Sequence, residues 1–134
     1  MNLIRVFVYG TLKPGEYNYQ RYCQQQVVQT ETAIALGQLF QLPMGYPAMV
    51  LGEGVVQGII LSFPDSSILP ALDQLEDYDP QRPPEQNEYQ RQQIQTYNGD
   101  HQPLKQAWAY TMTLQSVQRF KGARIIPTGC WSSS

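Results

Sequence analysis

One short stretch of the sequence combines glycines and small polar residues in a pattern suited to anion binding. Residues Val8 to Gly15 read Val-Tyr-Gly-Thr-Leu-Lys-Pro-Gly, directly after alternating apolar residues. Gly10 and Gly15 permit positive φ, and Thr11 and Leu12 between them can turn their N–H groups outward. Such amides suit a carboxylate or a developing oxyanion. The alternative is that the glycines only turn the chain after an edge strand, and the loop alone does not separate the two interpretations.

A second candidate is a carboxylate at the end of a short amphipathic segment. Glu76 follows Leu72 by four positions and Leu75 by one, so on a helix it borders the apolar stripe. Burial there would raise its pKa toward neutrality, as a group that accepts and returns a proton near pH 7 requires. The alternative is a solvated glutamate at the helix end that extends into solvent or pairs with Arg82 or Arg91.

Tyrosines form the third group of candidates, because several stand at expected strand ends or loop entries, where a phenol can reach a cavity. They are Tyr9, Tyr46, Tyr78, Tyr89, Tyr97 and Tyr110. Tyr9 adjoins the glycine loop, and Tyr46 with Pro47 can wall a pocket. Tyr89 begins the strand that follows the acidic segment, so we expect it to be the polar partner of Glu76. Most of the tyrosines are expected to be packing residues with solvated hydroxyls, and Tyr110 is expected to lie in the core with Trp108.

Composition excludes several classes of function. The formal net charge is -2 with a pI near 5.2, and the few Lys and Arg residues are scattered, so nucleic acid is not an expected partner. The chain has a single histidine, His101, and lacks a Cys/His cluster with ligand spacing. A metal site and a Ser/His/Asp triad are therefore not expected. Cys23 and Cys130 are expected to be free thiols.

The amino-terminal segment bears on localisation. Its apolar run is interrupted by Arg5 and is far too short to cross a bilayer. It also lacks the basic start and the cleavage site of a signal peptide. We therefore expect a soluble, cytoplasmic protein with no membrane partner.

The secondary structure expected around these candidates is mostly short strands. Apolar or alternating segments predict strands at residues 4–9, 32–42, 55–63, 89–97 and 105–111. Asn98, Gly99 and Asp100 separate the last two, which is typical of a β-hairpin. Helices are expected at 17–26 and 68–77, the second with Ser67 as N-cap and Pro70 in its first turn.

These elements predict a mixed α+β fold built as one unit. Several strands with two short helices can close into a small β-barrel with the helices packed against it. The length suits one domain, which we place at residues 1–131, with residues 132–134 as a flexible serine tail.

With these residues in view, the chain resembles the gamma-glutamylcyclotransferase-like proteins, which include the AIG2-like group and the gamma-glutamylamine cyclotransferases. The resemblance runs nearly end to end. It rests on residues 8–15 with Asn18, and on residues 45–48, 50–53, 72–76, 89–91 and 126–131. The Tyr-Gly-Thr-Leu loop and the Leu-Asp-x-x-Glu segment are together specific, although neither is specific alone.

The resemblance implies a small mixed barrel in which the loop from Tyr9 to Leu12 holds a gamma-glutamyl group and Glu76 is the acid/base. Two positions depart from the family pattern. Asp77 stands where the family usually has glycine, which adds a negative charge beside Glu76. Cys130 stands where the closing motif commonly has aspartate, so any contact of that carboxylate is lost.

The expected reaction is therefore cyclisation of a gamma-glutamyl amide or peptide to 5-oxoproline, with release of an amine or amino acid and without a cofactor. The substrate-binding residues are expected to be Tyr9, Gly10, Thr11, Leu12 and Tyr89. A non-catalytic module that binds a small ligand in the same cavity is the main alternative, and a protein-interaction domain without a cavity is a further one. The sequence leaves open the identity of the gamma-glutamyl substrate and whether the protein is a monomer or a homodimer.

Overall fold

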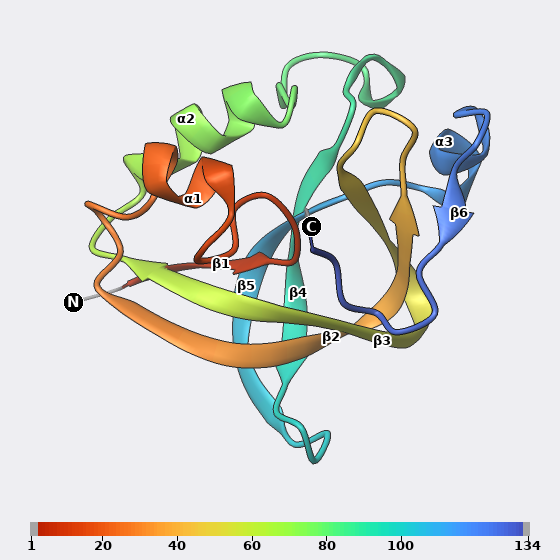
Figure 1. Cartoon of the computed structure of the whole chain (residues 1–134). Coiled ribbons are helices and arrows are strands. Elements are labelled where there is room, and N and C mark those ends of the chain that lie inside the picture. Colours follow the sequence, from red (N-terminus) through yellow and green to blue (C-terminus); the bar gives the residue numbers. More distant parts are fainter. Residues whose placement is uncertain (1–2, 133–134) are drawn as a thin grey trace.

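The computed structural model describes residues 3–132 of the chain (Figure 1). In this part of the chain the strands are β1 (Ile4–Val8), β2 (Gln29–Gln41), β3 (Pro47–Phe63), β4 (Gln90–Tyr97), β5 (Pro103–Thr111) and β6 (Arg124–Ile125). The helices are α1 (Tyr17–Tyr22), α2 (Ile68–Leu75) and α3 (Leu114–Gln118), with a 3₁₀ turn, η1 (Pro84–Gln86). The expected strands and helices are all present, whereas α3, β6 and η1 were not predicted.

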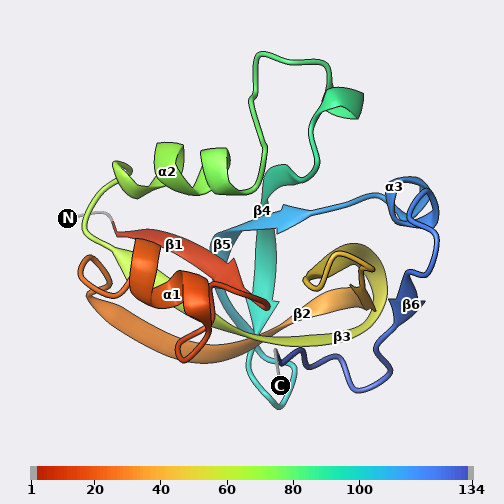
Figure 2. The same cartoon turned by 45° about the horizontal axis from the view of Figure 1, so that its top comes forward.

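The sheet closes on itself. Its neighbours follow the order β3-β1-β5-β4-β2-β6, and β2 also pairs with β3, so β1 to β5 form a ring to which β6 is attached (Figure 2). β1 and β5 run parallel, and the other pairs are antiparallel. The predicted mixed α+β fold with a small β-barrel is therefore confirmed. The predicted hairpin is also confirmed, because β4 and β5 pair antiparallel on either side of residues 98–102.

The hairpin of β2 and β3 is longer than the sequence indicated. β3 begins at Pro47 rather than at Val55, and its register against β2 shifts between Leu36 and Gly37. The shift accommodates a bulge in β3, where Gly52 and Gly54 have φ of 151° and 105°. These glycines interrupt the alternating pattern in the sequence, which is why the prediction began the strand too late.

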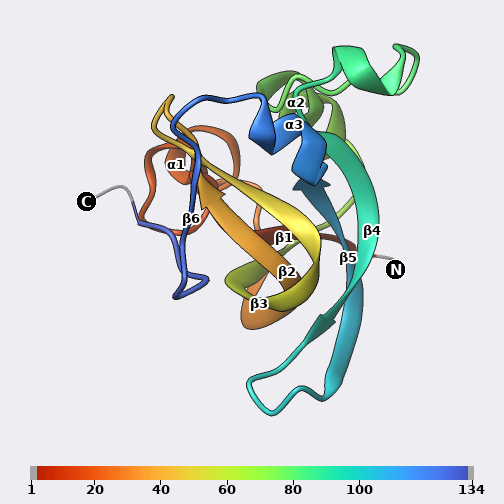
Figure 3. The same ribbon diagram turned by 90° about the vertical axis from the view of Figure 1, so that its right-hand side faces the viewer.

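Alternate residues of each strand face opposite sides of the barrel wall. In β1, Phe7 belongs to a cluster of strand residues and Trp131, while Val6 and Val8 belong to a second cluster that includes Leu72 of α2. The cluster without helix residues is the barrel interior, which we call the lumen. Figure 3 shows the helices gathered at one end of the barrel, opposite the turn between β4 and β5.

Helix α2 brings the acidic segment to the barrel. Its apolar side chains Ile68, Leu69 and Leu72 are buried. Ser67 is the N-cap residue, as expected, but its side chain makes no capping hydrogen bond. The helix ends at Leu75, two residues earlier than predicted, because Asp77 adopts a left-handed conformation with φ of 53°.

Three further expectations concern the ends of the chain and its thiols. Ser133 and Ser134 of the expected flexible tail lie outside the described residues. Cys23 is buried and Cys130 is exposed, and both are free. Within residues 3–132, no helix is long and apolar enough to cross a membrane.

Candidate active site

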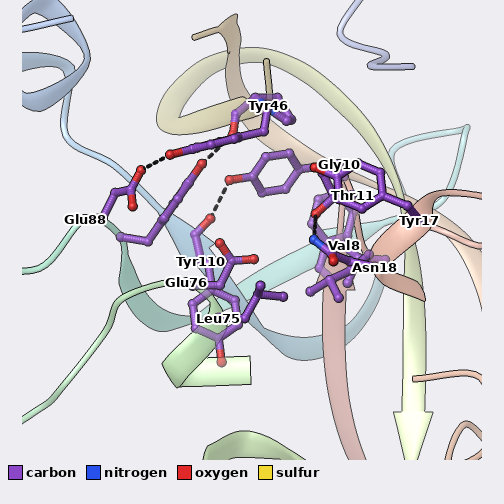
Figure 4. A pocket seen from close by; sticks show the side chains of 15 residues that line it. Val8, Gly10, Thr11, Tyr17, Asn18, Tyr46, Leu75, Glu76, Glu88 and Tyr110 are labelled. Carbon is purple, nitrogen blue, oxygen red and sulfur yellow. Dashed lines mark hydrogen bonds between the residues drawn. The ribbon is translucent and has the colours of Figure 1, made fainter. Parts of the chain in front are cut away.

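A cavity of about 320 Å³ opens beside the end of β1, between the glycine loop and the end of α2 (Figure 4). It is lined by residues from β1 and its loop, α1, the start of β3, the end of α2, the segment before β4, and β5. They are Phe7, Val8, Tyr9, Gly10, Thr11, Leu12, Tyr17, Asn18, Tyr46, Pro47, Leu75, Glu76, Glu88, Tyr89 and Tyr110. The structure thus brings together all six residues that the sequence selected, although their roles stay predictions.

The glycine loop is held in one shape by hydrogen bonds. The Lys13 N–H donates to the Gly10 carbonyl at 3.0 Å, and the Asn18 side-chain amide donates to the Thr11 hydroxyl at 2.9 Å. Gly10 also needs to be glycine, because a Cβ there would lie 2.6 Å from Cγ of Pro47. The loop can therefore approach the opposite wall of the cavity.

The same loop leaves amide donors free. Within residues 3–132, the backbone N–H groups of Gly10, Thr11 and Leu12 donate no hydrogen bond to the protein. Unpaired N–H groups gathered in one turn form a concave site of positive partial charge. Such a site suits a carboxylate, and the binding role of the loop stays a prediction.

Glu76 lies between this loop and the opposite rim of the cavity (Figure 4). It is the C-cap residue of α2, and its N–H donates to the Leu72 carbonyl at 2.9 Å. Burial, and to a lesser extent the negative charge of Glu88, raises the pKa of the Glu76 carboxyl from 4.5 to about 8. The carboxyl is therefore suited to exchange protons near neutral pH.

Neither arginine proposed as a partner of Glu76 binds it. Arg82 pairs with Asp77 at 3.0 Å, and Arg91 lies 3.5 Å from the carboxylate of Asp73. Within the described residues, the Glu76 side chain has no hydrogen bond or ion pair. The alternative of a solvated, paired glutamate is thus not what the structure shows.

Asp77 lies outside the cavity lining, although it is next to Glu76 in the sequence. Its left-handed backbone explains why glycine suits this position, and aspartate is among the residues that tolerate it best. Its carboxylate pairs with Arg82, outside the cavity lining. Cys130, the second departure, is exposed and also lies outside the lining.

The hydroxyls of the two tyrosines that the sequence assigned to substrate binding already donate to protein acceptors. Tyr9 donates to the Tyr110 carbonyl at 2.6 Å, and Tyr89 donates to the Pro47 carbonyl at 2.6 Å. Tyr89 is therefore not the hydrogen-bond partner of Glu76 that we expected. Burial raises the pKa of both phenols well above the ordinary value, so they stay protonated and shape the cavity.

Glu88 is a charged lining residue that the sequence reasoning did not select as a site residue, although it ends a loop that was expected to wall the cavity. It stands before Tyr89 in a polar loop without periodicity, and its carboxylate accepts a hydrogen bond from the Tyr46 hydroxyl across the cavity rim (Figure 4). Its only signals in the sequence were its place in that loop and its place next to Tyr89. Glu88 gives the cavity a second carboxylate.

The lining thus carries two carboxylates and, among the described residues, no lysine, arginine or histidine. Any anionic group of a ligand must be held by backbone amides and neutral donors, whereas an ammonium group would be attracted to the carboxylates. Residues 3–132 also contain no cluster of three His, Cys, Asp or Glu side chains able to hold a metal ion.

The structure therefore combines a small mixed barrel with a cavity in which an amide-lined loop faces a carboxylate of raised pKa. Sequence comparison places the chain within one family. It belongs to the gamma-glutamyl cyclotransferase, AIG2-like family, whose model matches residues 6–133. Membership supports a cyclotransferase-type function.

Solved structures agree with this assignment. The chain is 30% identical to the protein YtfP from Escherichia coli, with a TM-score of 0.59 and 96% of each chain covered. It is 25% identical to YkqA from Bacillus subtilis, with a TM-score of 0.67 over 97% of this chain but only 40% of YkqA. An AIG2-like protein from Mus musculus is 21% identical, with a TM-score of 0.73 over 98% of this chain and 90% of that one, and shows the shared fold. A search of curated proteins found no match.

Proposed function

We propose that this protein is a gamma-glutamyl cyclotransferase that cyclises a gamma-glutamyl amide or peptide to 5-oxoproline and releases an amine or amino acid. The observation that carries the proposal is the unpartnered Glu76 carboxyl, with its pKa raised to about 8, inside a cavity whose opposite wall offers free backbone amides. Family membership supports the reaction class, while the role of Glu76 rests on its geometry.

Binding orients the substrate for an intramolecular reaction. The N–H groups of Gly10, Thr11 and Leu12 hold the α-carboxylate, and the ammonium end lies toward Glu76. Bending the gamma-glutamyl chain toward a five-membered ring places its α-nitrogen near its own side-chain carbonyl carbon. Well-oriented intramolecular reactions reach effective molarities of roughly 10⁵–10⁸ M, so this orientation supplies much of the rate enhancement.

Glu76 then transfers protons in both halves of the reaction. The α-ammonium of the bound substrate first releases one proton to solvent, because only the neutral amine carries the lone pair that attacks. As a carboxylate, Glu76 then takes a second proton from the α-nitrogen while that nitrogen forms a bond to the side-chain carbonyl carbon. The protonated Glu76 returns the proton to the departing nitrogen as its bond to the same carbon breaks. Water is not consumed, and the carboxylate is regenerated with 5-oxoproline and the free amine as products.

The proposal is tested by measuring 5-oxoproline release from gamma-glutamyl dipeptides, gamma-glutamylamines and glutathione. In the Glu76→Gln variant we expect kcat to fall by about 10²–10⁴-fold, because the variant loses the general acid/base. Ligand affinity should change little, since the amide loop is intact. Glu53→Gln, an exposed glutamate on the bulge of β3 outside the cavity lining, is the matched control and should retain wild-type kcat.

Other outcomes would redirect the assignment. Substrate binding without product from either protein would contradict an enzyme and favour the ligand-binding module. Absence of both binding and turnover would overturn the substrate class. A closed or absent cavity between Gly10 and Glu76 would have favoured the protein-interaction alternative, and the structure has an open cavity there.

A further inference from the structure

Asp73, on the last turn of α2, makes a set of contacts that the proposed reaction does not use. Its carboxylate accepts a hydrogen bond from the Tyr110 hydroxyl at 2.7 Å, and Nε of Arg91 lies 3.5 Å from the same oxygen. The side chains of Asp73 and Arg91 are only 16% and 17% exposed. Removing one partner of a buried pair is costly, so this arrangement constrains the elements it joins.

Arg91 is itself held in place by aromatic rings. Its guanidinium lies 4.7 Å from the ring centre of Trp108 and 5.6 Å from that of Tyr78. Trp108 comes from β5, the neighbour of β4, and Tyr78 comes from the segment after α2. Since both rings restrict the guanidinium, it is a fixed anchor for Asp73 rather than a mobile surface cation.

Tyr110 connects the same carboxylate to the cavity. Its side chain lines the cavity beside Glu76, and its backbone carbonyl accepts the Tyr9 hydroxyl (Figure 4). Tyr110 is thus hydrogen-bonded to Asp73 of α2 through its hydroxyl and to Tyr9, which follows β1, through its carbonyl. The two walls that carry Glu76 and the amide loop share this fixed point.

Glu76 depends on the same helix end. It lies three residues after Asp73, beyond the last residue of α2, where no further helical turn supports it. The Asp73 carbonyl also accepts the Tyr78 N–H at 2.9 Å, which closes the chain behind Glu76. A shift of the last turn of α2 would therefore move the Glu76 carboxyl directly.

We propose that Asp73 is a positioning residue, which ties the end of α2 to Tyr110 of β5 and Arg91 of β4 and so holds the Glu76 carboxyl inside the cavity. The inference rests on the proposed function only for its effect on turnover. The effect on the surroundings of Glu76 is a separate consequence of the same contacts.

The proposal concerns position and not the charge of Asp73. The other titratable groups in the cavity lining are Glu88 and the phenols of Tyr9, Tyr17, Tyr46, Tyr89 and Tyr110. The charge of Asp73 is balanced by Arg91. A variant that keeps this charge while breaking a tether separates the two effects, and Tyr110→Phe does so because it removes only the hydroxyl.

The experiment compares Asp73→Asn and Tyr110→Phe with Asp77→Asn as the matched control. Asp77 is an aspartate at the same helix end, but it is 52% exposed, pairs with Arg82 and lies outside the cavity. The Glu76 carboxyl is followed through pH by carbon NMR on glutamate-labelled protein, with its signal assigned by its loss in Glu76→Gln. kcat, KM and Tm are measured on the same samples.

We expect the Glu76 pKa to move from about 8 toward its ordinary value in Asp73→Asn and Tyr110→Phe, because the carboxyl gains solvent when the helix end is released. Asp77→Asn should leave it unchanged. A displacement of about 1 Å can cost about 10²-fold in rate, so kcat should fall by roughly 10- to 100-fold in Asp73→Asn while KM stays within about threefold.

Two results distinguish a failure of the positioning role of Asp73 from a failure of the proposed reaction. If the wild type forms no 5-oxoproline but the Glu76 pKa falls in both tether variants and not in the control, the positioning role stands and the proposed reaction fails. If the wild type turns over and both tether variants match Asp77→Asn in pKa and kcat, Asp73 has no positioning role. A loss of Tm alone, without change in pKa or kcat, likewise overturns the inference.

Discussion

The lumen of the barrel and the cavity beside it are built from similar side chains, but the lumen is filled and the cavity is open. The lumen is lined by small residues such as Ala35 and Ala109, and it is filled by Phe7 and by Trp131, which are 1% and 2% exposed. The cavity is also walled by aromatic rings, yet it keeps about 320 Å³ open. In the cavity wall, the hydroxyls of Tyr9 and Tyr89 are fixed by hydrogen bonds to backbone carbonyls, and those of Tyr46 and Tyr110 by hydrogen bonds to the carboxylates of Glu88 and Asp73.

The treatment of polar groups differs in the same way. In the lumen, the Trp131 indole N–H donates to the Gln41 side chain at 2.9 Å, as a buried donor requires. Beside the cavity, Asp73 and Asp77 are paired with arginines, while Glu76, between them in sequence, is left without a partner. Of these three carboxylates at the end of α2, only the one that lines the cavity is therefore left without a partner, where chemistry is proposed.

Opening the lumen should produce the largest change in stability. Trp131→Ala removes a ring that nothing else can replace, and we expect it to lower the free energy of unfolding by about 3–5 kcal/mol. The backbone carbonyl of Trp131, which accepts the ammonium of Lys13 in the glycine loop, is retained. The kcat of the folded protein should therefore change little. Denaturant unfolding and active-site-normalised kinetics measure the two quantities.

Trp131→Phe keeps the experiment informative if the alanine variant does not fold. It retains most of the ring and loses the hydrogen bond to Gln41, so the expected cost is about 1–3 kcal/mol. A loss of kcat as large as that of Glu76→Gln in a stable Phe variant would show that the lumen and the cavity are not independent.

Removing the unpaired carboxylate of Glu76 should produce the next largest effect, and this effect depends on pH. Below about pH 4.5, Glu76 is protonated in both the folded and the unfolded chain. Because its pKa in the folded protein is about 8, a rise in pH from 4.5 to 8 ionises Glu76 only in the unfolded chain. Wild-type stability is therefore lost over this range, and Glu76→Gln does not share that loss.

The Tm of Glu76→Gln relative to the wild type should thus increase between about pH 4.5 and about pH 9. We expect a relative gain of at least about 4 °C, the shift that about 1 kcal/mol produces at this chain length. Thermal unfolding followed by circular dichroism measures it, with Glu53→Gln as the control. A difference that is constant with pH, or that falls, would mean that the Glu76 carboxyl is not destabilised by burial.

The contrast between local and long-range features also explains what the sequence could predict. The glycine loop, the β4–β5 turn and the placing of Glu76 beside Leu72 depend on residues close in the chain, and all six candidate site residues line one cavity. The hydrogen bonds of the tyrosines were not predictable. Tyr89 and its acceptor Pro47 are 42 positions apart, so only the closed barrel brings them together.

The two unpredicted carboxylate roles have the same origin. Asp73 gains its function from Arg91 and Tyr110, which reach it from β4 and β5. Glu88 gains its function from Tyr46 across the cavity rim. Asp73 is part of the Leu-Asp-x-x-Glu segment, but that pattern does not say which groups its carboxylate contacts, and Glu88 lies in a polar loop without periodicity. A helix or loop carboxylate is usually solvated, and the partners of these two become defined only when the sheet closes.

Glu88 provides the smallest expected effect and the most specific test of the cavity's charge balance. Its negative charge is the second cause of the raised Glu76 pKa, after burial. Glu88→Gln keeps the side-chain shape and an oxygen acceptor for the Tyr46 hydroxyl, but it removes the charge. The Glu76 pKa should therefore fall, by less than in the tether variants, because the carboxyl stays buried.

Since the reaction begins with the Glu76 carboxylate, the acid limb of the kcat/KM profile should move to lower pH by the same amount. An unchanged acid limb together with an unchanged NMR titration would show that Glu88 does not influence Glu76, whereas a shift as large as in Asp73→Asn would show that charge, and not burial, sets the proton affinity of the cavity.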